Sequence, residues 1–228
     1  MLLTDVRDTF YQSDPFLSTS TSPLLLFSDH PNLTISHWLV KAMVEKCHGK
    51  DALTDFSQPH LNSGSTMGSR EGIFQYVSAM LQEFDYMKVR DNCRSESTAD
   101  DQTVHNYLYY TGRLPDGAVL LPHRTGAVHV MAYEADVIFR KRIDQVYARG
   151  GFDEKVRAEE WVNANGYIDN QTGSWRNWLG PEHGLTDANG SILNVDGTLS
   201  PQVHQADRFG PFFSRYLERL NDEVRSNA

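Results

Sequence analysis

The sequence contains only two cysteines, Cys47 and Cys93, among its 228 residues. They form no CxxC motif and have no histidine at metal-ligand spacing, which argues against a zinc site built on thiolates. The two can form one disulfide, although their spacing does not require it. Neither cysteine has the surroundings of a nucleophile, and no Gly-x-Ser-x-Gly motif occurs. Acyl-transfer chemistry therefore has no support.

Long apolar runs and clusters of basic residues are also missing. No stretch is apolar for long enough to span a bilayer, and the N-terminus has no charged region followed by an apolar one. The chain has 21 Lys and Arg against 30 Asp and Glu, a net charge of −9. We therefore expect neither a nucleic-acid partner nor a direct membrane span. The location stays open between a Golgi or ER lumen, for a eukaryotic chain that has lost its anchor, and the cytoplasm.

Hydrophobic residues make up 39% of the chain, enough for the core of one domain. Their spacing predicts strands and helices that alternate in the first half, which favours an α/β fold with a mostly parallel sheet. The predicted strands cover 2–6, 24–27, 118–121 and 127–133. The predicted helices cover 36–47, 73–84, 103–112 and 211–221, with a possible helical insertion at 134–165. Ser69 is expected to cap the second helix and Gly112 to close the third.

Two acids, Asp5 and Asp8, follow the first predicted strand. At the carboxyl end of a strand, both carboxylates can project into the crevice where α/β folds bind ligands. Two close carboxylates repel each other unless a cation lies between them, and Mg²⁺ or Mn²⁺ would fill that role. The alternative is a solvated acidic turn in which Arg7 pairs locally.

Two polar segments are further candidates. Residues 61–69, LNSGSTMGS, are small enough for the backbone to approach a ligand, although a flexible connector has the same composition. They match neither a Walker loop nor a GxGxxG motif. Asp101, Gln102 and Asn106 lie at the start of a helix, where carboxylate and amide groups suit sugar hydroxyls or acid–base chemistry. They also suit an ordinary helix cap.

His204 ends a late predicted strand within VHQADR, residues 203–208. A neutral imidazole is a normal partner for two carboxylates on Mn²⁺, whereas a lone histidine is more often a structural residue. The remaining histidines are scattered without ligand spacing, and we expect no site from them. They are His30, His37, His48, His60, His105, His123, His129 and His183.

Taken in order, these segments resemble the catalytic part of a GT-A fold glycosyltransferase, a metal-dependent enzyme that uses a nucleotide-sugar donor. LLTDVRDTFYQSDPF is similar to the strand and turn that carry the DxD motif, in a DxxD variant. LNSGSTMGSREG resembles the family's N-[SA]-G-x-x-[IL]-G segment. DDQTVHN and VHQADR resemble the later D-D-Q-x-x-x-N and V-H-x-x-D-R segments. The resemblance covers about residues 1–210, and its specificity lies in the order of the four motifs.

The resemblance implies a role for each matched residue. Asp5, Asp8 and His204 would bind Mn²⁺ or Mg²⁺ and, through it, the donor diphosphate. Asn62, Ser63 and Gly64 would lie along the donor sugar or acceptor. Arg7 or Arg208 would offset the charge of the diphosphate, and no spacing selects between them. Asp101 and Gln102 would contact the transferring sugar, with Asp101 as the catalytic carboxylate. The partners would be a nucleotide-sugar donor and a glycan, glycoprotein or other hydroxyl acceptor.

The implied fold is a single α/β domain with an incomplete Rossmann-like mixed sheet flanked by helices. Family members carry a nucleotide-binding βαβ region before the DxD strand, whereas here Met1 lies four residues before Asp5. We therefore expect 1–228 to be the part of a GT-A domain from the DxxD strand onward. Two alternatives remain: a non-catalytic member that acts as a binding or assembly module, and a metal-dependent phosphoesterase.

Overall fold

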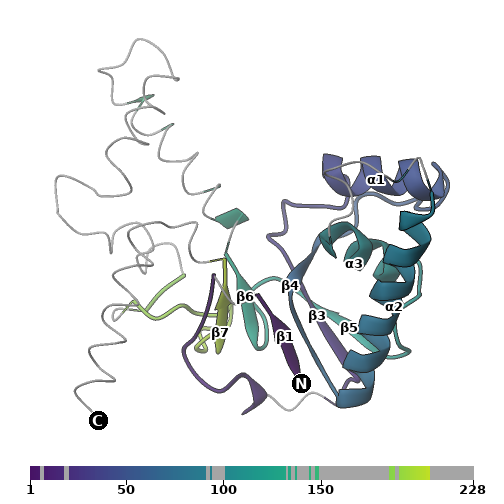
Figure 1. The fold of residues 1–228 in the computed structure, drawn as a ribbon. Coiled ribbons are helices and arrows are strands. Elements are labelled where there is room, and N and C mark those ends of the chain that lie inside the picture. The colour runs from purple at the N-terminus through teal and green to yellow at the C-terminus, as the bar shows by residue number, and fades with distance from the viewer. Residues whose placement is uncertain are drawn as a thin grey trace.

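The structure of the protein is a computed structural model, shown as a ribbon in Figure 1. It describes residues 1–5, 8–17, 21–90, 93, 101–131, 133–134, 137, 144, 147–148, 185–187 and 190–205. The predictions for 211–221 and for nearly all of 134–165 lie outside these residues, so they remain predictions. The described residues form a small α/β unit with two sheets and three α-helices.

The larger sheet has four strands in the order β1-β4-β3-β5. Their bounds are β1 Leu2–Thr4, β3 Leu24–Ser28, β4 Leu61–Gly68 and β5 Ala118–Leu121. β1 and β3 both run antiparallel to β4, and β5 runs parallel to β3. The carboxyl ends of β1, β3 and β5 therefore meet at one edge of this sheet, next to the first residues of β4.

Three α-helices lie on one side of the four-stranded sheet: α1 (Trp38–His48), α2 (Arg70–Lys88) and α3 (Asp101–Tyr110) (Figure 1). Alternate residues of β3 divide between its two faces, as expected for a strand. Leu24 and Leu26 pack with residues of all three helices, and both are fully buried. Burying a leucine side chain contributes about 1.5–3 kcal/mol, so this face anchors the helices.

A second sheet packs on the opposite face. It contains β2 (Thr9–Tyr11), β7 (Gln202–His204) and β6 (Val128–Val130) in the order β2-β7-β6. β7 is antiparallel to β2 and parallel to β6. Leu25 and Phe27 of β3 pack against Val128 and Val130 of β6, which holds the two sheets together. A short 3₁₀ turn, η1 (Pro15–Leu17), follows β2.

Most sequence predictions within the described residues are confirmed. The strands at 2–6, 24–27, 118–121 and 127–133 are present, each within a few residues of its expected bounds. Ser69 caps α2, since its Oγ accepts the N–H of Gly72 at 2.9 Å. Gly112 closes α3 with φ at 68°, and the N–H of Arg113 returns to the carbonyl of Leu108 at 2.9 Å. This pair of features forms a Schellman motif.

Two expectations about the sheet are wrong. The segment at 61–69 is neither a flexible connector nor a loop, because Leu61–Gly68 is β4, paired on both sides. The larger sheet is also not mostly parallel, since β4 runs against both of its neighbours; it is mixed, as the resemblance implied. Pairing with β1 and β3 makes this segment a strand, and its small residues Ser65 and Thr66 are fully buried.

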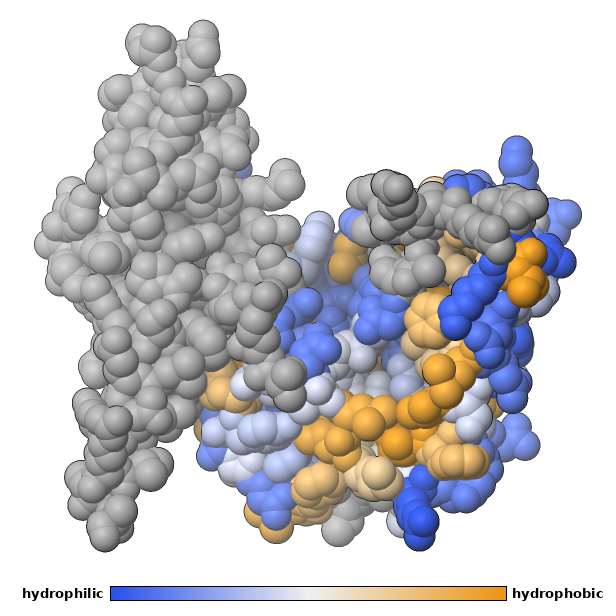
Figure 2. All heavy atoms as spheres, in the orientation of Figure 1, coloured by the Kyte–Doolittle hydropathy of each residue, from blue (hydrophilic) through white to orange (hydrophobic). Residues whose placement is uncertain are grey.

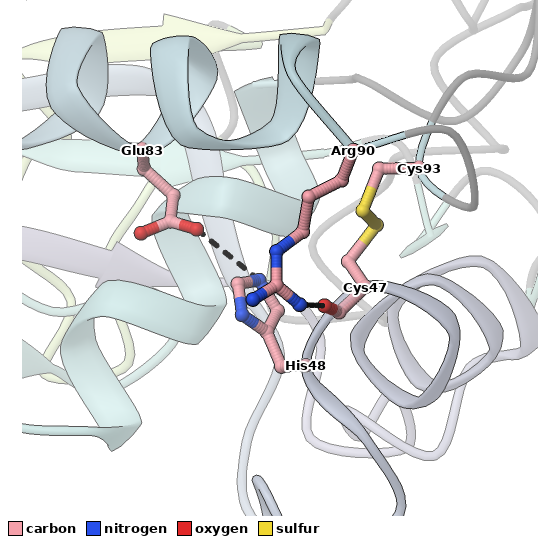
Figure 3. Close-up of a disulfide and its surroundings, with 5 residues drawn as sticks. All are labelled: Cys47, His48, Glu83, Arg90 and Cys93. Atoms are coloured by element: carbon pink, nitrogen blue, oxygen red, sulfur yellow. Dashed lines mark hydrogen bonds and ion pairs between the residues drawn. A yellow bond between two sulfur atoms is a disulfide. The ribbon is translucent and has the colours of Figure 1, made fainter.

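Cys47 and Cys93 form a disulfide with a sequence separation of 46 residues. It joins the end of α1 to the segment that follows α2 (Figure 3). Beside it, Nη1 of Arg90 donates to the carbonyl of Cys47 at 3.3 Å. Nε2 of His48 lies 3.2 Å from Oε1 of the fully buried Glu83, which also pairs with Arg113. The bond and these charges tie α1 to α2.

The outer face of α2 carries exposed apolar side chains at Phe74, Val77 and Leu81, which helical spacing places on one stripe. Figure 2 shows an apolar band on the side of the molecule that carries this helix. None of the helices in the described part of the chain combines the length and hydropathy of a membrane span.

Candidate metal centre

Asp5, Asp8 and His204 meet at the junction between the two sheets. Asp5 directly follows β1, Asp8 directly precedes β2, and His204 is the last residue of β7. Nε2 of His204 lies 3.3 Å from Oδ2 of Asp5 and 3.4 Å from Oδ1 of Asp8. One ligand atom from each residue thus lies within 4.8 Å of the other two. The structure brings together two acids and a histidine that are almost 200 residues apart.

Strand pairing fixes Asp5 and His204, and Asp8 directly precedes β2. The N–H of Asp5 donates to the carbonyl of Gly64 at 2.9 Å, which extends the β1–β4 ladder by one bond. His204 is paired on both sides, with Thr9 of β2 and with Val130 of β6. The site is therefore built on rigid elements at the carboxyl edge of the larger sheet, where α/β folds bind ligands.

Gly64 of β4 makes room for the three side chains. A Cβ atom at this position would lie 2.0 Å from Cε1 and 2.5 Å from Nε2 of His204. It would also lie 2.6 Å from Oδ2 of Asp5. Any other residue at position 64 would displace the imidazole or the carboxylate.

The unsatisfied polar atoms of this cluster fit a hard divalent cation. The two N–O distances exceed the usual range of an N–H···O hydrogen bond. Oδ1 of Asp8 and Nε2 of His204 are buried, and neither has a hydrogen-bond partner among the described residues. Neighbouring ligands of an octahedral Mg²⁺ lie about 2.9 Å apart, only slightly closer than these atoms. Two carboxylates and one neutral imidazole are also a donor set that Mn²⁺ accepts.

The cluster is buried on one side and open on the other. The side chain of His204 is fully buried, that of Asp8 is 13% exposed and that of Asp5 is 57% exposed. A cation held here would therefore keep coordination positions on the Asp5 side for water or for a ligand such as a diphosphate.

Gln202 positions this site, and the sequence analysis missed it. It lies two residues before His204 on β7, so both side chains project from the same face of the strand. Its fully buried side chain donates through Nε2 to Oγ1 of Thr4 at 2.8 Å and to Oγ of Ser65 at 2.7 Å. It therefore binds β7 to β1 and β4. The spacing of two residues from His204 was the signal that could have identified it.

The predicted donor-binding residues Asn62, Ser63 and Gly64 lie together at the start of β4. Oδ1 of Asn62 accepts the N–H of Gly64 at 3.0 Å, and Oε1 of Gln102 accepts both the N–H and the Oγ–H of Ser63 at 2.9 Å. Gln102 also donates to the carbonyl of Leu61. The Gln102 amide therefore hydrogen-bonds to the backbone of β4 and holds the start of α3 next to the site.

Asp101 is the first residue of α3 and is exposed. Its Oδ1 accepts the N–H of Gln102 at 2.8 Å. Asp101 therefore lies one residue from the amide that contacts Ser63, beside the start of β4. Its catalytic role and that of Gln102 remain predictions. Arg7 and Arg208 lie outside the described residues, so their role remains a prediction as well.

A buried carboxylate–imidazole pair lines the same edge of the sheet and was not anticipated. Asp29 directly follows β3, and its Oδ2 lies 2.7 Å from Nδ1 of His60, which precedes β4. Nε2 of Gln102 lies 3.3 Å from the same His60 nitrogen. A carboxylate that orients an imidazole is the arrangement of many general bases. The two residues are far apart in sequence, so only the pairing of β3 with β4 brings them together.

A second cluster contains His123, His129 and Glu134, of which the two histidines were expected to make no site. Nε2 of His123 lies 3.0 Å from Oε1 of Glu134, and Nε2 of His129 lies 2.7 Å from Oε2. Burial lowers the pKa of His129, against a smaller raising effect of Glu134. Burial raises the pKa of Glu134, but His129 and hydrogen bonds from both imidazoles lower it to about 2.

Comparisons of the chain with family models, with curated proteins and with solved structures find no match.

Proposed function

We propose that the chain is the catalytic part of a metal-dependent glycosyltransferase that uses a nucleotide-sugar donor. One observation carries the proposal: Asp5, Asp8 and His204 converge, with their ligand atoms within 4.8 Å of one another, around a glycine that leaves them room. The resemblance to GT-A enzymes implies a metal at these same three residues. A solvated acidic turn gives no reason for a buried histidine to meet both acids.

We assign separate roles to the residues of the site. Asp5, Asp8 and His204 would hold Mn²⁺ or Mg²⁺, which when bound offsets negative charge on the departing nucleoside diphosphate. Asp5, the most exposed of the three, faces the side from which the diphosphate would enter. Asp101 would act beside the transferring sugar, and Gln102 would keep the start of β4 in place next to it.

Calorimetry with Mn²⁺ and then with UDP or GDP tests this proposal. We expect Asp8→Asn to weaken Mn²⁺ binding at least about tenfold, a loss of about 1.4 kcal/mol, and to abolish metal-dependent nucleotide binding. Asp51→Asn is the matched control, because Asp51 is exposed in the turn after α1. If Asp8→Asn binds both ligands as the unaltered chain does, the proposal is wrong.

A second variant separates catalysis from binding. We expect Asp101→Asn to bind Mn²⁺ and nucleotide normally and to lose transfer or hydrolysis of a nucleotide sugar, since its carboxylate lies outside the metal cluster. Equal loss of binding in Asp101→Asn would contradict the catalytic assignment of this residue. Release of phosphate from simple esters without any acceptor would instead favour a phosphoesterase.

A further inference from the structure

We propose that His123, His129 and Glu134 bind a second metal ion, Zn²⁺ or a similar borderline transition metal, at a site separate from the acidic cluster. His123 follows β5, His129 lies at the centre of β6, and Glu134 lies four residues beyond the end of β6. Their side chains are 6%, 0% and 7% exposed. One ligand atom from each lies within 4.8 Å of the other two.

The donor set favours zinc over the hard cations expected at the acidic cluster. Two imidazoles and one carboxylate are ligands that Zn²⁺ prefers, whereas Mg²⁺ prefers oxygen. Ligands of a tetrahedral Zn²⁺ at 2.0–2.1 Å lie about 3.3 Å apart. The two N–O distances here are 3.0 and 2.7 Å, so the ligand atoms need to move apart by about 0.3 and 0.6 Å.

One ring nitrogen of each imidazole makes no hydrogen bond within the described residues. Nδ1 of His123 and Nδ1 of His129 are buried without a hydrogen-bond partner in the part of the chain that the structure describes. Each Nε2–H donates to Glu134. On metal binding each Nε2 gives up its proton to coordinate the ion and each ring takes up a proton at Nδ1, so no net proton is released.

One positive charge opposes a cation at this position. Nε of Arg124 lies 4.0 Å from Oε1 of Glu134. The guanidinium also donates to the carbonyl of Leu193, through Nη2 at 3.2 Å, so it is held toward that backbone rather than between the three ligands. The carboxylate of Glu134 therefore has one oxygen shared with Arg124 and the other, Oε2, directed at His129.

The register of the smaller sheet separates this cluster from the acidic one. His129 of β6 pairs with Val203 of β7, and Val130 pairs with His204. Neighbouring residues of a strand project to opposite faces, so His129 and His204 lie on opposite faces of the sheet. A metal at the second cluster would link β5 of the larger sheet to β6 of the smaller one.

Zinc uptake by an Asp8→Asn chain, in which metal binding at the acidic cluster is weakened, tests the proposal. After loading with Zn²⁺ and dialysis, we expect about one zinc per chain. We also expect Co²⁺ to replace it with the visible absorption of a four- or five-coordinate ion. Adding Glu134→Gln should lower Zn²⁺ affinity at least about tenfold, whereas adding Glu71→Gln, an exposed carboxylate on α2, should not.

Circular dichroism of the metal-free variants shows whether each is folded before metal is added. If Glu134→Gln does not fold, His123→Gln provides the second variant with the same expected loss. The proposal is overturned if the folded Asp8→Asn chain retains no zinc, or if folded Asp8→Asn/Glu134→Gln retains as much as Asp8→Asn does. Loss of Mn²⁺ binding in Asp8→Asn concerns only the acidic cluster, so failure of either proposal can be recognised separately.

Discussion

The absence of a side chain at position 64 is what allows Asp5 and His204 to approach each other. We expect Gly64→Ala to lower Mn²⁺ affinity at least about tenfold, because the added Cβ would lie 2.0–2.6 Å from atoms of both ligands. Calorimetry measures this change. Ser63→Ala is the control, since it removes only a hydroxyl that bonds Gln102 and should leave Mn²⁺ affinity unchanged. A Gly64→Ala chain that binds Mn²⁺ normally would contradict this account of the site.

A single buried histidine should make stability depend on pH. Burial, with a smaller contribution from His60, lowers the pKa of the fully buried His105 to about 3. Between pH 3 and the ordinary histidine pKa near 6.5, His105 is protonated in the unfolded chain but neutral in the folded one. The contribution of His105 to the free energy of unfolding is therefore complete above about pH 6.5. About 1.4 kcal/mol of it is lost per pH unit as the pH falls toward 3.

Urea unfolding between neutral pH and about pH 5 measures this dependence. We expect His105→Asn, which keeps a polar atom near the hydroxyl of Tyr76, to flatten the slope by about 1.4 kcal/mol per pH unit. The His105 Nδ1 lies 2.9 Å from that hydroxyl. An unchanged slope in the variant would mean that other groups carry the pH dependence.

At the scale of elements, β4 shows what sequence patterns can and cannot predict. The apolar runs of β1, β3 and β5 and the helical spacing in α2 mark those elements locally. The Gly- and Ser-rich sequence of β4 is typical of a loop. It forms a strand because it pairs with β1 and β3, and its own residues do not predict this. For the same reason the pairing of Asp29 with His60 was not foreseeable from spacing. His123, His129 and Glu134 lie within twelve residues of the sequence, so their proximity was a signal that the sequence analysis missed.

Asn106 is a second amide, besides Gln102, that bonds α3 to β4. Oδ1 of Asn106 accepts the N–H of Leu61 at 2.9 Å, and its Nδ2 donates to the Leu61 carbonyl at 2.9 Å. Asn106→Ala would leave the N–H of Leu61 without this partner, whereas the Leu61 carbonyl would keep the amide of Gln102. One unsatisfied buried group costs about 1–3 kcal/mol, so we expect the free energy of unfolding in urea to fall by about that amount. Gln75→Ala, on the exposed side of α2, should change it by less than about 0.5 kcal/mol.

At the scale of the whole molecule, the acidic cluster depends on the two ends of the described chain meeting. The order of the motifs indicated this meeting, since the DxxD segment and the late histidine belong to one site in the family that the chain resembles. The path that brings them together was not predicted: β7 inserts between β2 and β6, and Gln202 fastens it to the larger sheet. Such long-range pairing leaves no local pattern in the residues.

The disulfide should contribute to global stability through the 46-residue separation that it closes. Cross-linking of this kind contributes about 2–4 kcal/mol, largely by restricting the unfolded chain. We expect the Cys47→Ser/Cys93→Ser variant to unfold at lower urea, with a loss of that size. Reductant should destabilise the unaltered chain and have no effect on the variant. If reductant affects both equally, the bond is not the source of the change.

The position of β7 also has a consequence for synthesis of the protein. β2 is complete at Tyr11, but its only partner strand among the described residues, β7, does not begin until Gln202. At 5–20 residues per second, the ribosome takes roughly 10–40 s to make the intervening chain. During that time the edge that β2 will offer to β7 has no native partner, and unpaired edges invite association with other chains. We therefore expect the nascent chain to be most prone to misassembly just before β7 emerges, with the cluster of Asp5, Asp8 and His204 completed last.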